Sequence, residues 1–219
     1  MITLNNAPVA DVLDRMYAAA DAQIAELRND ASGRFADLSG ASAQERADAL
    51  SDIYMPVTRE AGRLLYSLVR AAKPAVVVEF GMSFGVSTLH LASAVRDNGT
   101  GRVFTTELSD SKIAAATGIF GETGLDDVIT VLDGDAMTTL RTVSGEIGFV
   151  LLDGWKELYL PVLELIEPRL ATGALLVADN TSMADTQPYL DYVREPANGY
   201  TSVNFPVRDS DSMELSCRV

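Results

Sequence analysis

Residues 76–87 read VVVEFGMSFGVS, and this stretch decides how the rest of the chain is arranged. Residues 76–80 have the composition of a buried strand, residues 81–85 form a glycine-rich turn, and an apolar helical segment follows to about residue 95. A strand that leads through a glycine turn into a helix lets the backbone approach a nucleotide-like ligand. The pattern is typical of three sites: a dinucleotide fingerprint, the nucleophile elbow of a serine hydrolase, and the first cofactor loop of a methyltransferase.

Beyond this stretch, strand-like apolar runs alternate with helical segments. The expected strands are residues 76–80, 102–107, 128–132, 147–153 and 174–179, and the expected helices are residues 87–96, 109–120, 136–142, 157–170 and 186–194. This alternation predicts an α/β fold with a Rossmann-like, doubly wound, mostly parallel sheet. Residues 200–207 and 213–219, on either side of a polar turn, predict a C-terminal antiparallel hairpin.

Helices are expected before the sheet. Apolar residues recur with helical spacing over residues 8–29, and Ser42 and Glu45 have the spacing of a capping box that starts a second helix. Thr58 is the expected N-cap of a third helix over residues 59–72, and Ser109 is the expected N-cap of the helix at 109–120. Residues 31–40 predict a loop. We therefore expect a single domain over 1–219, with a helical N-terminal cap (1–73) and a Rossmann-like core (74–219).

The composition excludes several kinds of site and partner. The 219 residues contain one cysteine, Cys217, which rules out an internal disulfide and a metal site built from cysteines. The 17 basic and 31 acidic side chains give a net charge of −14, which repels phosphate backbones and anionic lipids, so neither nucleic acid nor a membrane is an expected partner. No apolar run approaches the roughly 18 residues that span a bilayer, and no secretory signal is visible. We expect a cytoplasmic protein.

Two of the three interpretations of the glycine turn are disfavoured. The only histidine, His90, lies inside the helix that follows Ser83, whereas the histidine of a hydrolase triad comes after the acid, from a late loop. His90 is therefore predicted to be a packed or surface helix residue. Ser83 also stands where a dinucleotide fingerprint has the glycine that admits a pyrophosphate, which favours a cofactor without phosphate.

Acidic residues gather where the expected strands end. Because the carboxyl ends of parallel strands meet at one edge of a sheet, these side chains should lie close together. Clustered carboxylates repel one another unless a metal, a sulfonium or ribose hydroxyls neutralise them. Glu107 lies 22 residues after Gly85, where an acid reaches the ribose of an adenosine-type cofactor. The acids at or just after strand ends are Glu79, Glu107, Asp133, Asp135, Asp153 and Asp179.

The most specific patterns are DGWKELYLP at 153–161 and GALLVADN at 173–180. With VEFG at 78–81, TE at 106–107 and DGD at 133–135, they resemble the class I S-adenosylmethionine-dependent O-methyltransferases of the catechol and caffeoyl-CoA type. The D-x-W-K-x-x-Y-L-P form is most similar to the catechol enzymes. The resemblance runs from about Met55 to Asn180.

The resemblance implies transfer of a methyl group from S-adenosylmethionine to a hydroxyl of a small, catechol-like acceptor. It also implies a divalent cation, usually Mg²⁺, which binds two vicinal hydroxyls and lowers their pKa. Asp153, Asp179 and Asn180 would be the metal ligands, with Asp153 and Lys156 in catalytic roles and Lys156 as the general base. Trp155, Lys156 and Asn180 would contact the acceptor, although Trp155 could instead be a packing residue at a helix start. The implied cofactor-binding residues are Met55, Val57, Glu79, Gly81, Ser83, Ser87, Glu107, Asp135, Ala136 and Asp153.

Two departures from the family pattern bear on these expectations. Gly154 stands where the catechol enzymes have an adenine-stacking histidine, so the adenine packing should differ, and the turn at 208–212 matches no substrate motif. The alternatives are a metal-independent methyltransferase of the same fold acting on another alcohol or amine, and a non-catalytic protein that keeps the cofactor pocket. A homodimer is expected by analogy with the family.

Overall fold

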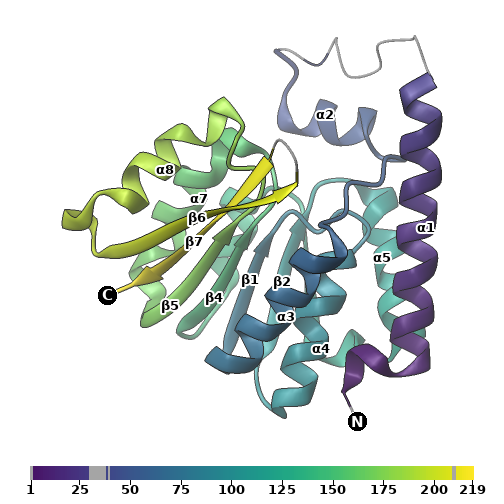
Figure 1. Ribbon diagram of the computed structural model, residues 1–219, viewed down its shortest axis with the longest axis horizontal. Helices are drawn as coiled ribbons and strands as arrows, with labels where there is room; N and C mark the ends of the chain where they lie inside the picture. The colour runs from purple at the N-terminus through teal and green to yellow at the C-terminus, as the bar shows by residue number, and fades with distance from the viewer. Residues whose placement is uncertain (1, 30–37, 39, 209–210) are drawn as a thin grey trace.

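The computed structural model describes residues 2–29, 38, 40–208 and 211–219, which form a seven-stranded sheet flanked by helices (Figure 1). The strand order is β3-β2-β1-β4-β5-β7-β6, with β1 to β5 parallel and β7 antiparallel to both of its neighbours. The predicted fold class, including the C-terminal hairpin, is confirmed. The strands are β1 (Val76–Phe80), β2 (Arg102–Glu107), β3 (Ile129–Asp133), β4 (Ile147–Leu152), β5 (Leu170–Ala178), β6 (Tyr200–Arg208) and β7 (Asp211–Arg218).

Helices cover both faces of the sheet, and α2 lies beyond the carboxyl ends of the strands (Figure 1). Alternate strand residues face opposite layers: Val77 and Leu151 belong to one core cluster, and Val78 and Leu152 belong to the other. Within the described part of the chain, no helix has the length and apolar character needed to cross a membrane. One layer contains α1 (Ala7–Asn29), α3 (Arg59–Ala72), α4 (Val86–Asn98) and α5 (Asp110–Thr123), the other contains α6 (Ala136–Thr139), α7 (Tyr159–Ile166) and α8 (Gln187–Arg194), and α2 is Ala43–Ala49. Short 3₁₀ helices span Thr3–Asn5, Asp126–Val128, Leu140–Thr142, Lys156–Leu158, Glu167–Arg169, Ala184–Thr186 and Pro196–Asn198.

The predicted N-terminal helices are confirmed, together with their caps. The Ser42 side chain accepts a hydrogen bond from the Glu45 backbone N–H, and the Glu45 carboxylate accepts one from the Ser42 N–H, which completes the capping box. The Thr58 hydroxyl accepts a hydrogen bond from the Ala61 N–H at the start of α3. The loop predicted at 31–40 falls mostly outside the described residues, as do residues 209 and 210 of the hairpin turn.

One local prediction was wrong, and another was confirmed only in part. The helix expected to reach residue 170 ends at Ile166, because Pro168 cannot continue an α-helix, and Leu170 already belongs to β5. Ser109 occupies the N-cap position of α5, but its side chain makes no capping hydrogen bond. The Glu107 carboxylate accepts hydrogen bonds from the N–H groups of Leu108 and Ser109, which precede the helix.

The glycine turn after β1 packs directly against the backbone that follows β4. Gly81 has φ +100°, and a Cβ atom built on it would lie 2.6 Å from the Gly154 nitrogen and 2.7 Å from the Asp153 carbonyl carbon. Backbone atoms cannot move aside as a flexible side chain could. Only glycine therefore fits at position 81, both for its backbone angles and for its space.

We expect Gly81→Ala to destabilise the protein by about 1–3 kcal/mol, because the new methyl group must displace backbone that carries Asp153. Gly118→Ala is the matched control: Gly118 is an exposed glycine within α5, and its added Cβ would meet nothing within 4 Å. That change should be neutral or stabilising by up to about 1 kcal/mol. Urea unfolding of both variants measures the effect, and equal stability of Gly81→Ala and the unmodified protein would contradict it.

Glu79, at the carboxyl side of β1, is fully buried in the sheet. Its Oε2 accepts hydrogen bonds from the hydroxyls of Thr88 and Thr105, each at 2.5 Å. Burial raises the pKa of Glu79 to about 7, although hydrogen bonds from Ser87, Thr105 and Thr88 act in the opposite direction. The folded protein therefore holds this proton more tightly than the unfolded chain does.

The stability of the protein should thus fall as the pH rises from about 4.5, the ordinary pKa of Glu79, through about 7. Glu79→Gln removes the titrating group. The free energy of unfolding of the variant, minus that of the unmodified protein, should therefore increase by on the order of 3 kcal/mol as the pH rises over this range. Urea unfolding of both proteins at pH 5 and pH 8 measures this change. A stability difference that is the same at both pH values would show that Glu79 does not titrate in this way.

Candidate active site

A cavity of about 840 Å³ lies at the carboxyl edge of the sheet. The cavity lies near the ends of β1 and β4, where the strand order reverses. Ligands of α/β proteins commonly bind at this position. The volume of the cavity suits a small-molecule ligand. Its walls come from the glycine turn, from the ends of β2, β4 and β5, and from α1, α2 and residues 54–59. The sequence-predicted site residues that line it are Met55, Val57, Gly81, Ser83, Ser87, Glu107, Asp135, Ala136, Asp153, Trp155, Lys156, Asp179 and Asn180.

Glu79 is the predicted site residue that does not line the cavity. Its carboxylate is held inside the sheet by Thr88 and Thr105, below the turn. The strand period explains the difference: Glu79 alternates with Val78 and Phe80, which face the opposite helical layer. Glu79 therefore links β1 to α4 and β2.

Glu107 ties the glycine turn to the start of α5. Its Oε2 accepts a hydrogen bond from the Ser83 N–H at 2.8 Å, and its Oε1 accepts from the N–H groups of Leu108 and Ser109 at 2.9 and 3.0 Å. Ser83 itself has φ +50°, a left-handed conformation that costs a non-glycine residue about 1–2 kcal/mol. The Ser83 hydroxyl lines the cavity and has no hydrogen-bond partner among the described residues.

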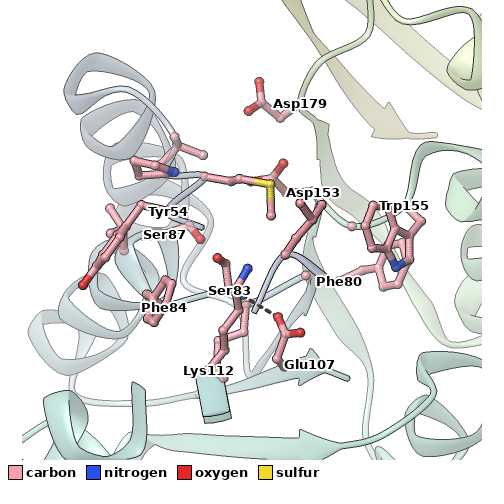
Figure 2. A pocket seen from close by; sticks show the side chains of 18 of the residues that line it. Tyr54, Phe80, Ser83, Phe84, Ser87, Glu107, Lys112, Asp153, Trp155 and Asp179 are labelled. Carbon is pink, nitrogen blue, oxygen red and sulfur yellow. Dashed lines mark hydrogen bonds between the residues drawn. The ribbon is translucent and has the colours of Figure 1, made fainter. Parts of the chain in front are cut away.

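An aromatic pair that the sequence analysis missed forms one wall of the cavity. The rings of Tyr54 and Phe84 stack with centroids 4.2 Å apart and planes at 17° (Figure 2). Gln23 of α1 fixes this segment, because its side chain accepts a hydrogen bond from the Tyr54 N–H at 2.7 Å. Tyr54 directly precedes Met55, which the resemblance implies to bind the cofactor. This neighbourhood in the sequence could have indicated that Tyr54 belongs to the site.

The absence of a side chain at Gly154 also has a structural reason. A Cβ atom built on Gly154 would lie 2.6 Å from the ring of Phe80. The Phe80 side chain lines the cavity and occupies the space that a histidine at position 154 would need. A side chain at position 154 would therefore have to displace the Phe80 ring.

Two carboxylates face the cavity at the ends of β4 and β5, and both are shown in Figure 2. Asp179 is 2% exposed and the side chain of Asp153 is 13% exposed. Burial raises the pKa of Asp153 to about 7, Lys156 lowers it, and the charge of Asp179 raises it further. Two buried acids that repel each other are the arrangement that a bound cation would relieve.

Lys156 lies beside these acids. Its Nζ donates hydrogen bonds to Asp153 Oδ1 at 3.3 Å and to the Tyr159 hydroxyl at 2.8 Å. The Tyr159 hydroxyl in turn donates to the Asp179 carbonyl oxygen at 3.0 Å. Burial raises the pKa of Tyr159 well above its ordinary value, so this phenol stays protonated and keeps the Lys156 amine oriented.

The C-terminal hairpin reaches the site through Asn180. This residue has φ +56°, a left-handed conformation that asparagine tolerates better than most residues. Its side-chain amide donates to Asp211 Oδ2 at 2.6 Å, and the adjacent Thr181 N–H donates to the Ser212 carbonyl at 2.9 Å. No three His, Cys, Asp or Glu side chains of the described residues group as a metal site. The oxygen-bearing side chains that the cavity brings together at the ends of β4 and β5 are those of Asp153, Asp179 and Asn180.

Trp155 lines the cavity beneath α2. The guanidinium group of Arg46 lies 4.2 Å from the centre of the Trp155 ring and forms an ion pair with the Glu157 carboxylate. These contacts fasten α2 to the segment that carries Lys156. Arg46 was not predicted as a site residue, because nothing local in the sequence relates α2 to the end of β4.

Lys112 was also missed. It lies on α5, lines the cavity and is 3% exposed. Lys112 lies five residues after Glu107, in the first turn of the helix that follows β2. This short distance along the chain could have indicated that Lys112 belongs to the site. A lysine in a helix pattern is usually solvated, and only the packing of α5 turns this one inward.

His90 is packed away from the cavity, as expected. It is 4% exposed, lies 3.4 Å from the Tyr17 hydroxyl, and leaves no room for a Cβ atom at Gly62. Burial lowers the pKa of His90 to about 4. A hydrolase triad built on Ser83 and His90 is not supported.

Comparison with known proteins agrees with this geometry. Residues 78–181 match the family described as "Methyltransferase domain". The probable O-methyltransferase Rv1703c of Mycobacterium tuberculosis is 35% identical over 146 residues, which cover 62% of this chain and 61% of that protein. Catechol O-methyltransferase of Sus scrofa is 29% identical over 147 residues, which cover 64% of this chain and 78% of that enzyme. The crystal structure of cofactor-bound Rv0187 from MTB superposes with a TM-score of 0.68 at 25% identity, covering 84% of this chain and 94% of that one.

The chain spans about three fifths of the length of the first of these relatives. The stretch that matches the family contains the glycine turn and the acids at the ends of β2, β4 and β5, together with Lys156 and Asn180. In its sheet order and in this stretch of sequence, the chain is thus similar to O-methyltransferases, among them catechol O-methyltransferases.

Proposed function

We propose that this protein transfers a methyl group from S-adenosylmethionine to a hydroxyl of a small, catechol-like acceptor, with the help of a divalent cation. One observation supports this above all: Asp153, Lys156, Asp179 and Asn180 share a single cavity with Glu107 and the glycine turn. A donor set for a cation and an acid suited to a ribose thus face the same space. The naming of catechol O-methyltransferases among the relatives supports the choice of acceptor.

The glycine-turn side of the cavity fits the cofactor. The Ser83 hydroxyl is buried without a partner among the described residues, and Glu107 presents a carboxylate where ribose hydroxyls are expected. Met55, Val57, Ser87, Asp135 and Ala136 complete this side. S-adenosylmethionine, if held there, would supply an electrophilic methyl group to the acceptor oxygen and leave as S-adenosylhomocysteine.

The opposite side fits a hard cation and the acceptor. Two carboxylates and an amide are the oxygen donors that Mg²⁺ prefers, and the mutual repulsion of Asp153 and Asp179 favours a cation between them. Asp153, Asp179 and Asn180 would hold it, and it would lower the pKa of the acceptor hydroxyl. Trp155 provides a flat apolar wall for an aromatic acceptor.

Lys156 is the residue that we assign to proton removal. Its Nζ is oriented by Tyr159 and lies at the cavity wall beside Asp153. In this role it takes the hydroxyl proton as the oxygen attacks the methyl carbon. Much of the rate should come from holding the oxygen and the methyl group in line, which the fixed walls of the cavity favour.

Methyl transfer to catechol should require a divalent cation, and Asp179→Asn should lower kcat/KM by about 100-fold or more, because several kcal/mol of stabilisation are lost with one charged donor. The measurement is transfer of labelled methyl to catechol and caffeoyl-type acceptors with Mg²⁺, with chelator, and with chelator followed by excess Mg²⁺. Asp185→Asn, which changes an exposed acid that does not line the cavity, is the matched control and should keep full activity.

Two other results of these assays would each favour a different function. Full activity in chelator together with an active Asp179→Asn variant would indicate a metal-independent methyltransferase. Tight binding of S-adenosylmethionine without turnover on any acceptor would indicate a non-catalytic cofactor-binding protein.

The contact between Arg46 and Trp155 should affect the acceptor more than the cofactor. We expect Arg46→Gln to raise the KM of the acceptor several-fold while leaving the Kd of S-adenosylhomocysteine nearly unchanged, since a cation–π contact contributes about 0.5–2 kcal/mol. Trp155 is the only tryptophan, so its fluorescence reports the loss of the contact directly. Arg15→Gln, which breaks an exposed ion pair with Glu122, is the control and should change neither quantity. An unchanged emission spectrum in Arg46→Gln would contradict the contact.

A further inference from the structure

Lys112 is a buried cation in the cavity for which the proposed chemistry has no use. Its side chain rises from the first turn of α5 toward Ser83 and Glu107 (Figure 2). Its Nζ lies 5.4 Å from the centre of the Phe84 ring, and the residue is 3% exposed. A lysine at this depth is rarely left without an acceptor for its N–H groups.

Within the described residues, the Lys112 ammonium makes no hydrogen bond or ion pair with the protein. The charges of Glu107 and Asp52 favour its protonated form, but burial outweighs them and lowers the pKa of Lys112. Neither acid approaches closely enough to satisfy the ammonium. The open side of the group faces the cavity, so an acceptor has to come from whatever the cavity holds.

The hydrogen bonds of Glu107 suggest which acceptor this is. A carboxylate offers about four acceptor positions. The N–H groups of Ser83, Leu108 and Ser109 take three of them, which leaves about one for a ligand. A ribose presents two vicinal hydroxyls, and Glu107 can accept a hydrogen bond from only one of them.

We propose that Lys112 binds the cofactor ribose together with Glu107: Glu107 accepts a hydrogen bond from one hydroxyl, and the Lys112 ammonium donates one to the oxygen of the other. This inference rests on the proposed function, because it assumes that an adenosine-type cofactor occupies the cavity. It adds a residue to the cofactor site and assigns the two hydroxyls to different partners. The two hydroxyls need different partners because three backbone N–H groups already use three acceptor positions of the Glu107 carboxylate.

Isothermal titration with S-adenosylhomocysteine and its 2′-deoxy and 3′-deoxy analogues tests the proposal. Lys112→Met keeps the length of the side chain and removes the donor, and it should weaken binding of S-adenosylhomocysteine by roughly 10- to 100-fold. For one of the two deoxy analogues, the one that lacks the hydroxyl bound by Lys112, the unmodified protein and the variant should bind with nearly equal Kd. For the other analogue the full difference should remain.

Two further variants complete the experiment. Lys112→Gln keeps an N–H donor without the charge and should recover part of the preference for the intact ribose, which a purely structural role would not produce. Lys73→Met removes an exposed lysine at the end of α3 and should change none of the three Kd values. Circular dichroism confirms that each variant is folded.

Equal losses for all three ligands in Lys112→Met, or no loss for any of them, would overturn the role of Lys112. If the unmodified protein failed to bind S-adenosylhomocysteine at all, the proposed function would fail instead. The two failures are therefore distinguishable in the same titrations.

Discussion

The site depends on one close contact between two backbone segments. Gly81, after β1, lies against Asp153 and Gly154, after β4, with no space for even a methyl group between them. Because both segments are the ends of adjacent parallel strands, the sheet fixes their distance. The glycine turn and Asp153, which both line the cavity, are thereby held together. The proposed methyl transfer needs two reactants in line and would depend on such a fixed separation.

Around this contact the fold gathers several carboxylates and stabilises each one differently. Glu107 is stabilised by the backbone N–H groups of the turn and of α5, whereas Glu79 is buried with two threonine hydroxyls and holds its proton. Asp153 is paired with Lys156, and Asp179 lies close enough to raise its pKa. Acids that look alike along the sequence therefore have different tasks, and the difference lies in the donors that surround each of them.

Segments far apart in the sequence brace the side of the cavity that we propose for the acceptor. Arg46 of α2 lies on Trp155, and Asp211 of the C-terminal hairpin accepts the amide of Asn180. The side proposed for the cofactor is lined by the turns after β1, β2 and β3 and by residues 54–59. In the proposed function, a change in α2 or in the hairpin would therefore act on the acceptor and leave the glycine turn in place.

The sequence by itself determined the alternation of strands and helices, the glycine turn and the acids at the strand ends, because each depends on a local pattern of a few residues. It placed Ser109 at the N-cap of α5 correctly, but it did not predict that the Glu107 carboxylate accepts the N–H groups of Ser83, Leu108 and Ser109. Tertiary structure alone decided that the Lys112 side chain is buried and that the Arg46 guanidinium stacks on Trp155. These contacts join residues from separate elements, and their geometry follows from how the helices pack on the sheet, which no local pattern encodes.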